Sequence, residues 1–236
     1  MKKNILIVGG SSGVGLDLAK HYVADGHSVC ITGRRDPQLQ GAKFHHLDIG
    51  AGEMSAQLDE LLNGFSGIHT VIYAAGFLQR GKIETLDDGA LASMVNLGLL
   101  VPMMLVARLK PIAPTPLKVM LIGSSSGYTP RPNEPAYAAA KAGLSMFGAS
   151  IARDREIGKV LVAAPSGINT RFWAGTDEDT STMLQSRWVA EQIVDLSSGA
   201  FKYKYAKILR DPARVEVVDC YDNAFQPINA ATTPHP

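Results

Sequence analysis

Tyr137 and Lys141 have the residue types and the spacing that acid–base chemistry requires. They stand four positions apart in the segment PAYAAAK, residues 135–141, and on a helix this spacing puts both side chains on one face. A tyrosine has an ordinary pKa of about 10, and a neighbouring ammonium favours the phenolate and so lowers that pKa. We therefore expect Tyr137 to exchange a proton with a substrate hydroxyl or carbonyl. The alternative is a tyrosine ring that merely packs on the lysine stem.

Ser124 is the residue expected to hold the oxygen atom of a substrate. It lies thirteen residues before Tyr137 and just after the apolar run Lys118–Ile122, at the edge where open α/β sheets build their sites. Ser125 and Ser126 compete for the same role, and the alternative is an ordinary turn rich in serine and glycine.

Asn96 begins an apolar helical stretch, and its amide is able to hold a water molecule linked to Lys141. An isolated asparagine in a helix more commonly bonds to the local backbone, which is the alternative here. With both roles filled, the expected catalytic residues are Asn96, Ser124, Tyr137 and Lys141.

A glycine-rich turn predicts a phosphate-binding site. The segment GGSSGVG, residues 9–15, follows the apolar run Asn4–Val8 and opens the helix expected at Val14–Asp25. Backbone N–H groups and the positive end of the helix dipole converge there, which suits a pyrophosphate. The spacing is GxxxGxG rather than GxGxxG, and the alternative is an ordinary Gly/Ser turn. The residues expected to bind a cofactor in this turn are Gly9, Ser11, Ser12, Gly13, Val14 and Gly15.

The residues after the second apolar run indicate which nicotinamide cofactor binds. In NAD sites an acidic residue at the end of the second strand holds the ribose 2′-OH. The corresponding position here is Gly33, which is followed by Arg34 and Arg35. A guanidinium fork suits a 2′-phosphate, so we expect NADP(H) to be preferred over NAD(H). The alternative is that both arginines are solvated charges of a turn.

Short β-branched runs alternate with amphipathic segments of helical length, which is typical of a parallel sheet covered by helices on both faces. The expected strands are Asn4–Val8, Ser28–Thr32, Lys43–Leu47, His69–Tyr73, Lys118–Ile122 and Lys159–Ala163, with a seventh near Arg214–Val218. The expected helices are Val14–Asp25, Ser55–Gly64, Leu86–Leu109 and Pro135–Glu156, with Gly26 and Gly158 as left-handed caps. The predicted fold class is α/β, with a single doubly wound Rossmann-type parallel sheet of six to seven strands.

This alternation continues along the chain, so we expect one catalytic domain over residues 1–225. The segment Gln226 to Pro236 is rich in Pro, Thr and Ala and indicates a mobile tail. The segment Arg171–Ser186 interrupts the alternation and is rich in Thr, Ser, Asp and Gly, which indicates a mobile lid. Phe172 and Trp173 in this segment suit either an apolar substrate pocket or packing of the lid onto the body.

Composition and charge exclude several classes of protein. Of 236 residues, 46% are hydrophobic and 19% are charged, which excludes a disordered chain and hints that subunits cover part of the surface. A net charge of +1 without a long basic block argues against nucleic-acid binding. The longest charge-free apolar stretch, Leu97–Ala107, is too short to span a bilayer, so no membrane segment is expected.

The cysteines and histidines do not predict a metal site. Cys30 and Cys220 are far apart in the chain and fit unpaired thiols in a reducing compartment, so we expect a cytoplasmic protein. His45 and His46 are adjacent in an expected strand, where alternation sends their side chains to opposite faces.

The motifs occur in the order found in one known family. With the glycine turn at 9–15, Asn96, Ser124 and the Tyr137/Lys141 pair, the chain resembles a classical short-chain dehydrogenase/reductase over essentially residues 1–200. The resemblance implies that Tyr137 is the catalytic acid/base and that Lys141 lowers its pKa and binds the nicotinamide ribose. It also implies that Ser124 orients the substrate and that Asn96 supports a proton relay.

Further cofactor contacts come from the resemblance alone. Asp48 and Ile49 match the family's contact to the adenine, and Thr170, five residues after Pro165, matches a residue near the carboxamide. The full set of additional contacts that the resemblance implies is Asp48, Ile49, Ala75, Gly76, Pro165, Ile168 and Thr170.

Three positions depart from the family's pattern. The family's Asn-Asn-Ala-Gly is here Tyr73-Ala74-Ala75-Gly76, so an asparagine that braces the sheet is absent. The family's Pro-Gly is Pro165-Ser166, and the customary threonine before the first glycine is Val8. None of these changes removes a proton-transfer group, so we expect an active enzyme.

The expected function is NADP(H)-dependent interconversion of a carbonyl and a secondary alcohol by hydride transfer. We expect a homodimer or homotetramer formed partly through the helices at 86–109 and 135–156. The alternative from another class is a catalytically silent NADP-binding sensor of the same fold. A sensor has no need of a tuned phenol, so the intact catalytic set argues against it. A sugar-nucleotide epimerase is disfavoured because only 95 residues follow Lys141, which leaves little room for a substrate domain.

Overall fold

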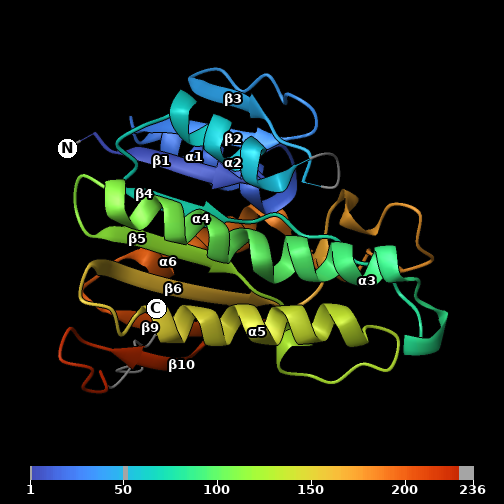
Figure 1. Cartoon of the computed structure of the whole chain (residues 1–236). Coiled ribbons are helices and arrows are strands. Elements are labelled where there is room, and N and C mark those ends of the chain that lie inside the picture. The colour runs from blue at the N-terminus through green and yellow to red at the C-terminus, as the bar shows by residue number, and fades with distance from the viewer. Residues whose placement is uncertain (1, 50–52, 229–236) are drawn as a thin grey trace.

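The computed structural model describes residues 2–49 and 53–228, and eight of its strands form one sheet (Figure 1). These strands are β1 (Asn4–Val8), β2 (Ser28–Gly33), β3 (Ala42–His46), β4 (Thr70–Tyr73), β5 (Leu117–Ile122), β6 (Ile157–Pro165), β9 (Tyr203–Arg210) and β10 (Ala213–Tyr221). They lie in the order β10-β9-β6-β5-β4-β1-β2-β3, and only the β9–β10 pair is antiparallel. A separate short pair joins β7 (Ile168–Asn169) to β8 (Leu184–Gln185).

Helices cover both faces of the sheet, as the predicted doubly wound fold requires. They are α1 (Gly13–Ala24), α2 (Met54–Gly64), α3 (Asp88–Val95), α4 (Val101–Leu109), α5 (Pro135–Ile151) and α6 (Ser186–Ser197). The apolar faces of α1 and α6 pack together on one side of the sheet. Those of α2, α4 and α5 pack on the other side, where Figure 1 shows α4 and α5 lying side by side in front of the strands.

The central strands are apolar at successive positions because helices cover both of their faces. All four residues of β4 are buried, as are Ile5–Val8 of β1 and Val119–Ile122 of β5. Since β1, β4, β5 and β6 are parallel, their carboxyl ends meet at one edge of the sheet. The segments that follow these four ends therefore lie close to one another and are able to build a common site.

The single helix expected at Leu86–Leu109 is interrupted. A π-helical turn at Asn96–Leu100 separates α3 from α4, and Pro102 stands in the first turn of α4. By length and composition alone, the helical stretch Asp88–Ile112 is long and apolar enough to cross a membrane. The sequence analysis did not foresee this, because it considered only the shorter charge-free stretch Leu97–Ala107. A buried core helix passes the same test, and the inward face of α4 packs on the sheet.

The strand β9, the helix α6 and the short pair β7–β8 were missing from the sequence prediction. The β9 strand, YKYAKILR, mixes two lysines with apolar residues rather than forming an apolar run, and several of its residues are only half-buried. The seventh strand expected near Arg214–Val218 lies within β10. The α6 helix buries Val189, Ala190, Ile193 and Leu196, a helical spacing that the sequence prediction overlooked beyond the expected lid.

One of the two predicted helix caps was wrong. Gly26 has φ +78° directly after α1, as a left-handed cap requires. Gly158 instead lies within β6, and α5 ends at Ile151 rather than Glu156. A Cβ atom at Gly158 would lie 2.6 Å from the carbonyl oxygen of Pro116, so close backbone approach is what requires this glycine.

The expected tail is only partly within the described chain. Residues 229–236 of that prediction lie outside the described residues. Before them, Pro227 bridges to Tyr221, and the Ile228 N–H donates to the carbonyl oxygen of Cys220, so these residues extend the edge at β10.

Candidate active site

A cavity of about 1020 Å³ lies at the carboxyl ends of the parallel strands. It brings together every residue that the sequence singled out for catalysis or cofactor binding. These are Gly9, Ser11, Ser12, Gly13, Val14, Gly15, Arg34, Arg35, Asp48, Ile49, Ala75, Gly76, Asn96, Ser124, Tyr137, Lys141, Pro165, Ile168 and Thr170. The motifs separated along the chain therefore share one site.

Tyr137 and Lys141 lie on the buried face of α5, which begins with Pro135 and continues through an alanine-rich turn. The Lys141 Nζ lies 5.7 Å from the centre of the Tyr137 ring and donates a 2.9 Å hydrogen bond to the carbonyl oxygen of Ile122. Burial lowers the pKa of Lys141 to about 8, because an ammonium loses its hydration there.

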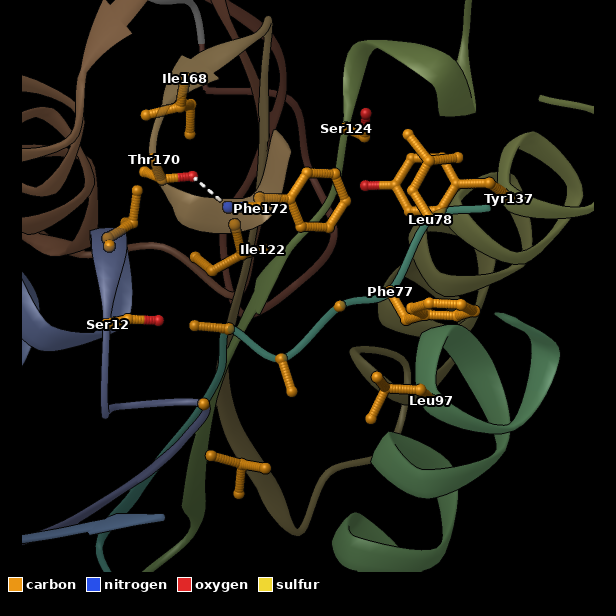
Figure 2. A pocket seen from close by; sticks show the side chains of 18 of the residues that line it. Ser12, Phe77, Leu78, Leu97, Ile122, Ser124, Tyr137, Ile168, Thr170 and Phe172 are labelled. Atoms are coloured by element: carbon orange, nitrogen blue, oxygen red, sulfur yellow. Dashed lines mark hydrogen bonds between the residues drawn. The ribbon is translucent and has the colours of Figure 1, made fainter. Parts of the chain in front are cut away.

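The pKa of Tyr137 departs from the sequence expectation. Burial raises it to about 12, while the hydrogen bond with Ser124 lowers it, the charge of Glu134 raises it and Arg131 lowers it. The expected lowering by Lys141 is absent because the ammonium lies over the ring and bonds to a backbone carbonyl. Figure 2 shows the phenolic oxygen pointing into the cavity between Ser124 and the Phe172 ring.

The three competing serines are separated by their hydrogen bonds. Ser124 follows β5, and its side chain lies beside the phenolic oxygen of Tyr137, whose pKa it lowers (Figure 2). The Ser125 hydroxyl accepts a 2.8 Å hydrogen bond from Arg131, and the Ser126 hydroxyl donates at 2.7 Å to Glu134. Ser124 is thus the serine of the three whose hydroxyl is directed toward the phenol.

Asn96 is the first residue of the π-helical turn and is half-buried at the wall of the cavity. This turn approaches α5 closely, since a Cβ atom at Gly98 would lie 2.9 Å from the Cβ atom of Ala140. π-Helical turns recur at functional sites because they shift side chains out of helical register. The turn thereby places Asn96 near the helix that carries Tyr137 and Lys141.

The glycine-rich turn fits a cofactor pyrophosphate. Gly9 has φ +84°, and a Cβ atom there would lie 2.5 Å from the backbone nitrogen of Ala75. A Cβ atom at Gly15 would lie 2.2 Å from the carbonyl oxygen of Gly9. Ser12 caps α1 without a side-chain hydrogen bond, and the first turn of α1 contains no acidic residue. Its N–H groups therefore present partial positive charge to the cavity.

The end of β2 carries a glycine where an NAD site has an acidic residue. A Cβ atom at Gly33 would lie 2.1 Å from the Ser11 hydroxyl oxygen, so the site leaves no room for an acidic side chain unless Ser11 moves. Arg34 and Arg35 are exposed at the rim of the cavity. Asp48 and Ile49 line the cavity just after β3.

Aromatic side chains cover the end of the cavity that holds Tyr137. The Phe172 ring lies 6.0 Å from the Tyr137 ring, and its backbone N–H donates to the Thr170 hydroxyl (Figure 2). A Cβ atom at Gly76 would lie 3.5 Å from Phe172. Phe77 and Leu78 also line this end (Figure 2). These residues form an apolar pocket beside the phenol.

Sequence reasoning missed Glu134 and Arg131, which line the cavity. No local signal marked them, because an acid and a base before a helix resemble an ordinary surface turn. Missing too were Phe77 and Leu78, which follow the Tyr73–Gly76 segment directly.

The described residues, 2–49 and 53–228, contain no group of three or more His, Cys, Asp or Glu side chains that could hold a metal ion. In β3, His45 is half-buried and His46 exposed.

Comparison with known proteins agrees with the geometry. A sequence profile of the short chain dehydrogenase family matches residues 3–181. An uncharacterized oxidoreductase of Bacillus subtilis (strain 168), DltE, is 26% identical over 248 aligned positions, covering 95% of this chain and 96% of its own. The 3-oxoacyl-[acyl-carrier-protein] reductase MabA of Mycobacterium tuberculosis is 25% identical over 183 positions, covering 75% of this chain and 74% of its own.

Solved structures show the same fold. BdcA in complex with NADPH has a TM-score of 0.77 at 22% identity, covering 91% of this chain and 96% of that chain. Because the family profile spans most of the sequence and the fold agrees with it, this protein belongs to the short chain dehydrogenase family of oxidoreductases.

Proposed function

We propose that the protein is an NADP(H)-dependent oxidoreductase that interconverts a carbonyl and a secondary alcohol, with Tyr137 as the acid/base. The observation that carries this proposal is that Ser124, Tyr137 and Lys141 lie in the same cavity as the glycine turn before α1. Proton-transfer groups and a phosphate-binding turn thus face one space, as hydride transfer to a bound carbonyl requires.

The nicotinamide, when bound, supplies or accepts the hydride at the substrate carbon. During reduction, the Tyr137 phenol gives its proton to the carbonyl oxygen, and during oxidation its phenolate takes the proton of the alcohol. Ser124 donates a hydrogen bond to the same oxygen and so orients it. Lys141 binds the nicotinamide ribose, and Asn96 holds a water through which the proton is exchanged. The apolar walls formed by Phe77, Leu78 and Phe172 exclude other water.

The cofactor is held along the strand ends. The N–H groups of the α1 turn would hold the pyrophosphate, Arg34 and Arg35 would hold the 2′-phosphate, and Asp48 and Ile49 would contact the adenine. Ala75, Gly76, Pro165, Ile168 and Thr170 line the nicotinamide end, together with the catalytic residues Tyr137 and Lys141. The preference for NADP(H) is supported by Gly33, which has no carboxylate. The Ser11 hydroxyl fills the space that a side chain at this position would need. The similar fold of BdcA holds NADPH in its own structure.

The wider setting is part of the same proposal. One domain spans residues 1–225, because a single sheet carries all the catalytic elements. The protein assembles as a homodimer or homotetramer, and no nucleic acid or membrane takes part. The free thiols of Cys30 and Cys220 suit a cytoplasmic location.

An assay with a panel of ketones, aldehydes and secondary alcohols tests the function through the absorbance of NADPH. The relative MabA is named as a 3-oxoacyl-[acyl-carrier-protein] reductase, so a 3-oxoacyl thioester belongs in the panel. We expect turnover of at least one carbonyl by wild type and none by Tyr137→Phe. NADPH binding without turnover of any panel member would instead identify a sensor.

A further inference from the structure

Glu134 is a buried carboxylate in the cavity wall, and neither the family motifs nor the proposed mechanism assigns it a role. Its side chain is 2% exposed. It occupies the N-cap position of α5, where an acidic side chain ordinarily accepts hydrogen bonds from the first-turn N–H groups. The Glu134 carboxylate makes no such bond. Because a buried carboxylate is unfavourable unless paired, the groups that it does contact indicate its role.

The carboxylate contacts one serine and two arginines. The Ser126 hydroxyl donates to its Oε2 at 2.7 Å. The Nε of Arg80 lies 3.7 Å from Oε1, and the Nε of Arg131 lies 3.9 Å from Oε2. Arg80 also pairs with Glu178 in the segment 171–186. Glu134 therefore contacts both Ser126, which lies beside Ser124 in the candidate active site, and Arg80, which pairs with Glu178 in the expected lid.

Ser126 carries the contact from Glu134 to Ser124. The backbone N–H of Ser126 donates to Ser124 Oγ at 3.1 Å, and the Ser124 hydroxyl donates to Ser126 Oγ at 3.3 Å. Since the proton of the Ser126 hydroxyl is engaged by Glu134, its oxygen is free only to accept from Ser124. Without substrate, the Ser124 proton therefore points to Ser126, and the Ser126 N–H holds the Ser124 oxygen in place. When a carbonyl binds, this proton turns from Ser126 to the carbonyl oxygen without movement of Ser124 Oγ.

We propose that Glu134 is a positioning residue that fixes the rotamer of Ser124 through Ser126. The inference rests on the proposed function, because a fixed Ser124 matters only where its hydroxyl holds the substrate oxygen. A Ser124 oxygen in another rotamer would be misplaced relative to the carbonyl, and small misplacements of such groups lower catalysis strongly.

The charge of Glu134 provides a readout that a purely structural role would not affect. After burial and the hydrogen bond with Ser124, the next influence on the Tyr137 pKa is this charge, which raises it against the opposite effect of Arg131. Lys141 lies over the ring, Arg171 lines the cavity, and Ala90 and Met94 of α3 belong to the apolar cluster that contains Tyr137. Removal of the charge should therefore lower the pKa of the phenol.

The test measures kcat of Ser126→Ala, Glu134→Leu and their double variant in the full chain. The substrate is a carbonyl compound that the wild-type protein turns over. Each single variant should lower kcat by roughly tenfold, the order expected for loss of a hydrogen bond to a buried charge. The double variant should lose no more than either single variant, because both break one chain. The dissociation constant of NADPH should not change. Ser150→Ala, on the exposed side of α5, is the matched control and should retain the kcat of wild type.

Glu134→Gln separates position from charge, since glutamine keeps an acceptor oxygen for Ser126. It should keep most of the kcat that Glu134→Leu loses, and it should shift the rising limb of alcohol oxidation to lower pH. Wild-type kcat in Ser126→Ala, or independent losses that multiply in the double variant, would overturn the inference even if Glu134→Leu fails to fold. If wild type turns over no substrate, the proposed function fails and the inference fails with it. If wild type is active and Ser126→Ala is equally active, the inference alone fails.

Discussion

The Tyr73 hydroxyl donates a 2.6 Å hydrogen bond to the carbonyl oxygen of Leu97. Tyr73 ends β4 at the position where the family's pattern has an asparagine, and Leu97 lies in the π-helical turn that begins with Asn96. The bond thus ties the centre of the sheet to the turn that carries a proposed catalytic residue.

Tyr73→Phe should destabilise the protein measurably. The substitution keeps the ring in the core but leaves the carbonyl oxygen of Leu97 without this donor, at a cost of about 1–2 kcal/mol. For a chain of this size that corresponds to a fall of roughly 2–8 °C in the melting temperature. Thermal unfolding followed by circular dichroism measures it. An unchanged melting temperature would show that water or a neighbouring N–H group replaces the hydroxyl.

The central strands and the glycine turn were predictable because each leaves a local signature. The apolar runs of β1, β4 and β5 reflect burial on both faces, and the glycines at 9 and 15 reflect close backbone contacts. The π-helical turn at Asn96–Leu100 has no such signature, since a hydrogen-bond shift inside an apolar helix leaves its composition unchanged. Glu134 was likewise unpredictable, because its partners Ser126 and Arg80 meet it only in the folded chain.

The buried Lys141 predicts a specific pH dependence of stability. Its pKa is about 8 in the folded protein against an ordinary value of 10.5, so between these values the unfolded chain binds more protons. The contribution of Lys141 to the free energy of unfolding is therefore lowest below pH ~8, and it rises as the pH approaches ~10.5. Lys141→Met has no ammonium to bury. The free energy of unfolding of this variant minus that of wild type should therefore be about 2 kcal/mol larger at pH 7 than at pH 9.5.

Urea unfolding of both proteins at the two pH values measures this difference. The comparison within one pH cancels the other lysines whose pKa burial lowers, such as Lys159 and Lys204. A difference between variant and wild type that does not change with pH would mean that the Lys141 ammonium is fully solvated.

Exposed apolar side chains on the π-helical turn and on α5 predict self-association. Leu100 and Met146 are 41% and 67% exposed, and they lie on the π-helical turn and on α5. Burial of such side chains between subunits is the expected reason for their exposure in one chain. Light scattering should give a dimer or tetramer at micromolar concentration, whereas a particle of 25.2 kDa would contradict it.

Arg34→Ala should weaken the preference for NADPH over NADH. A charge-assisted contact to the 2′-phosphate contributes about 1.5–3 kcal/mol, which is roughly 10- to 150-fold in dissociation constant. Fluorescence titration of both cofactors into wild type and the variant measures this, with Arg187→Ala, an exposed arginine outside the cavity, as the matched control. Equal affinities in wild type, or an unchanged preference in Arg34→Ala, would identify Arg34 as a solvated turn residue.

The turnover of Tyr137→Phe tests the central claim most directly, because the change removes one proton-transfer group and almost no volume. With a carbonyl substrate and NADPH, the account predicts a fall in kcat by about 10² to 10⁴, the usual contribution of a general acid. It also predicts a dissociation constant for NADPH within about twofold of wild type, since the loss lies in chemistry and not in binding. A variant that retains more than roughly a tenth of the wild-type kcat would contradict the account and move the proton transfer to another residue.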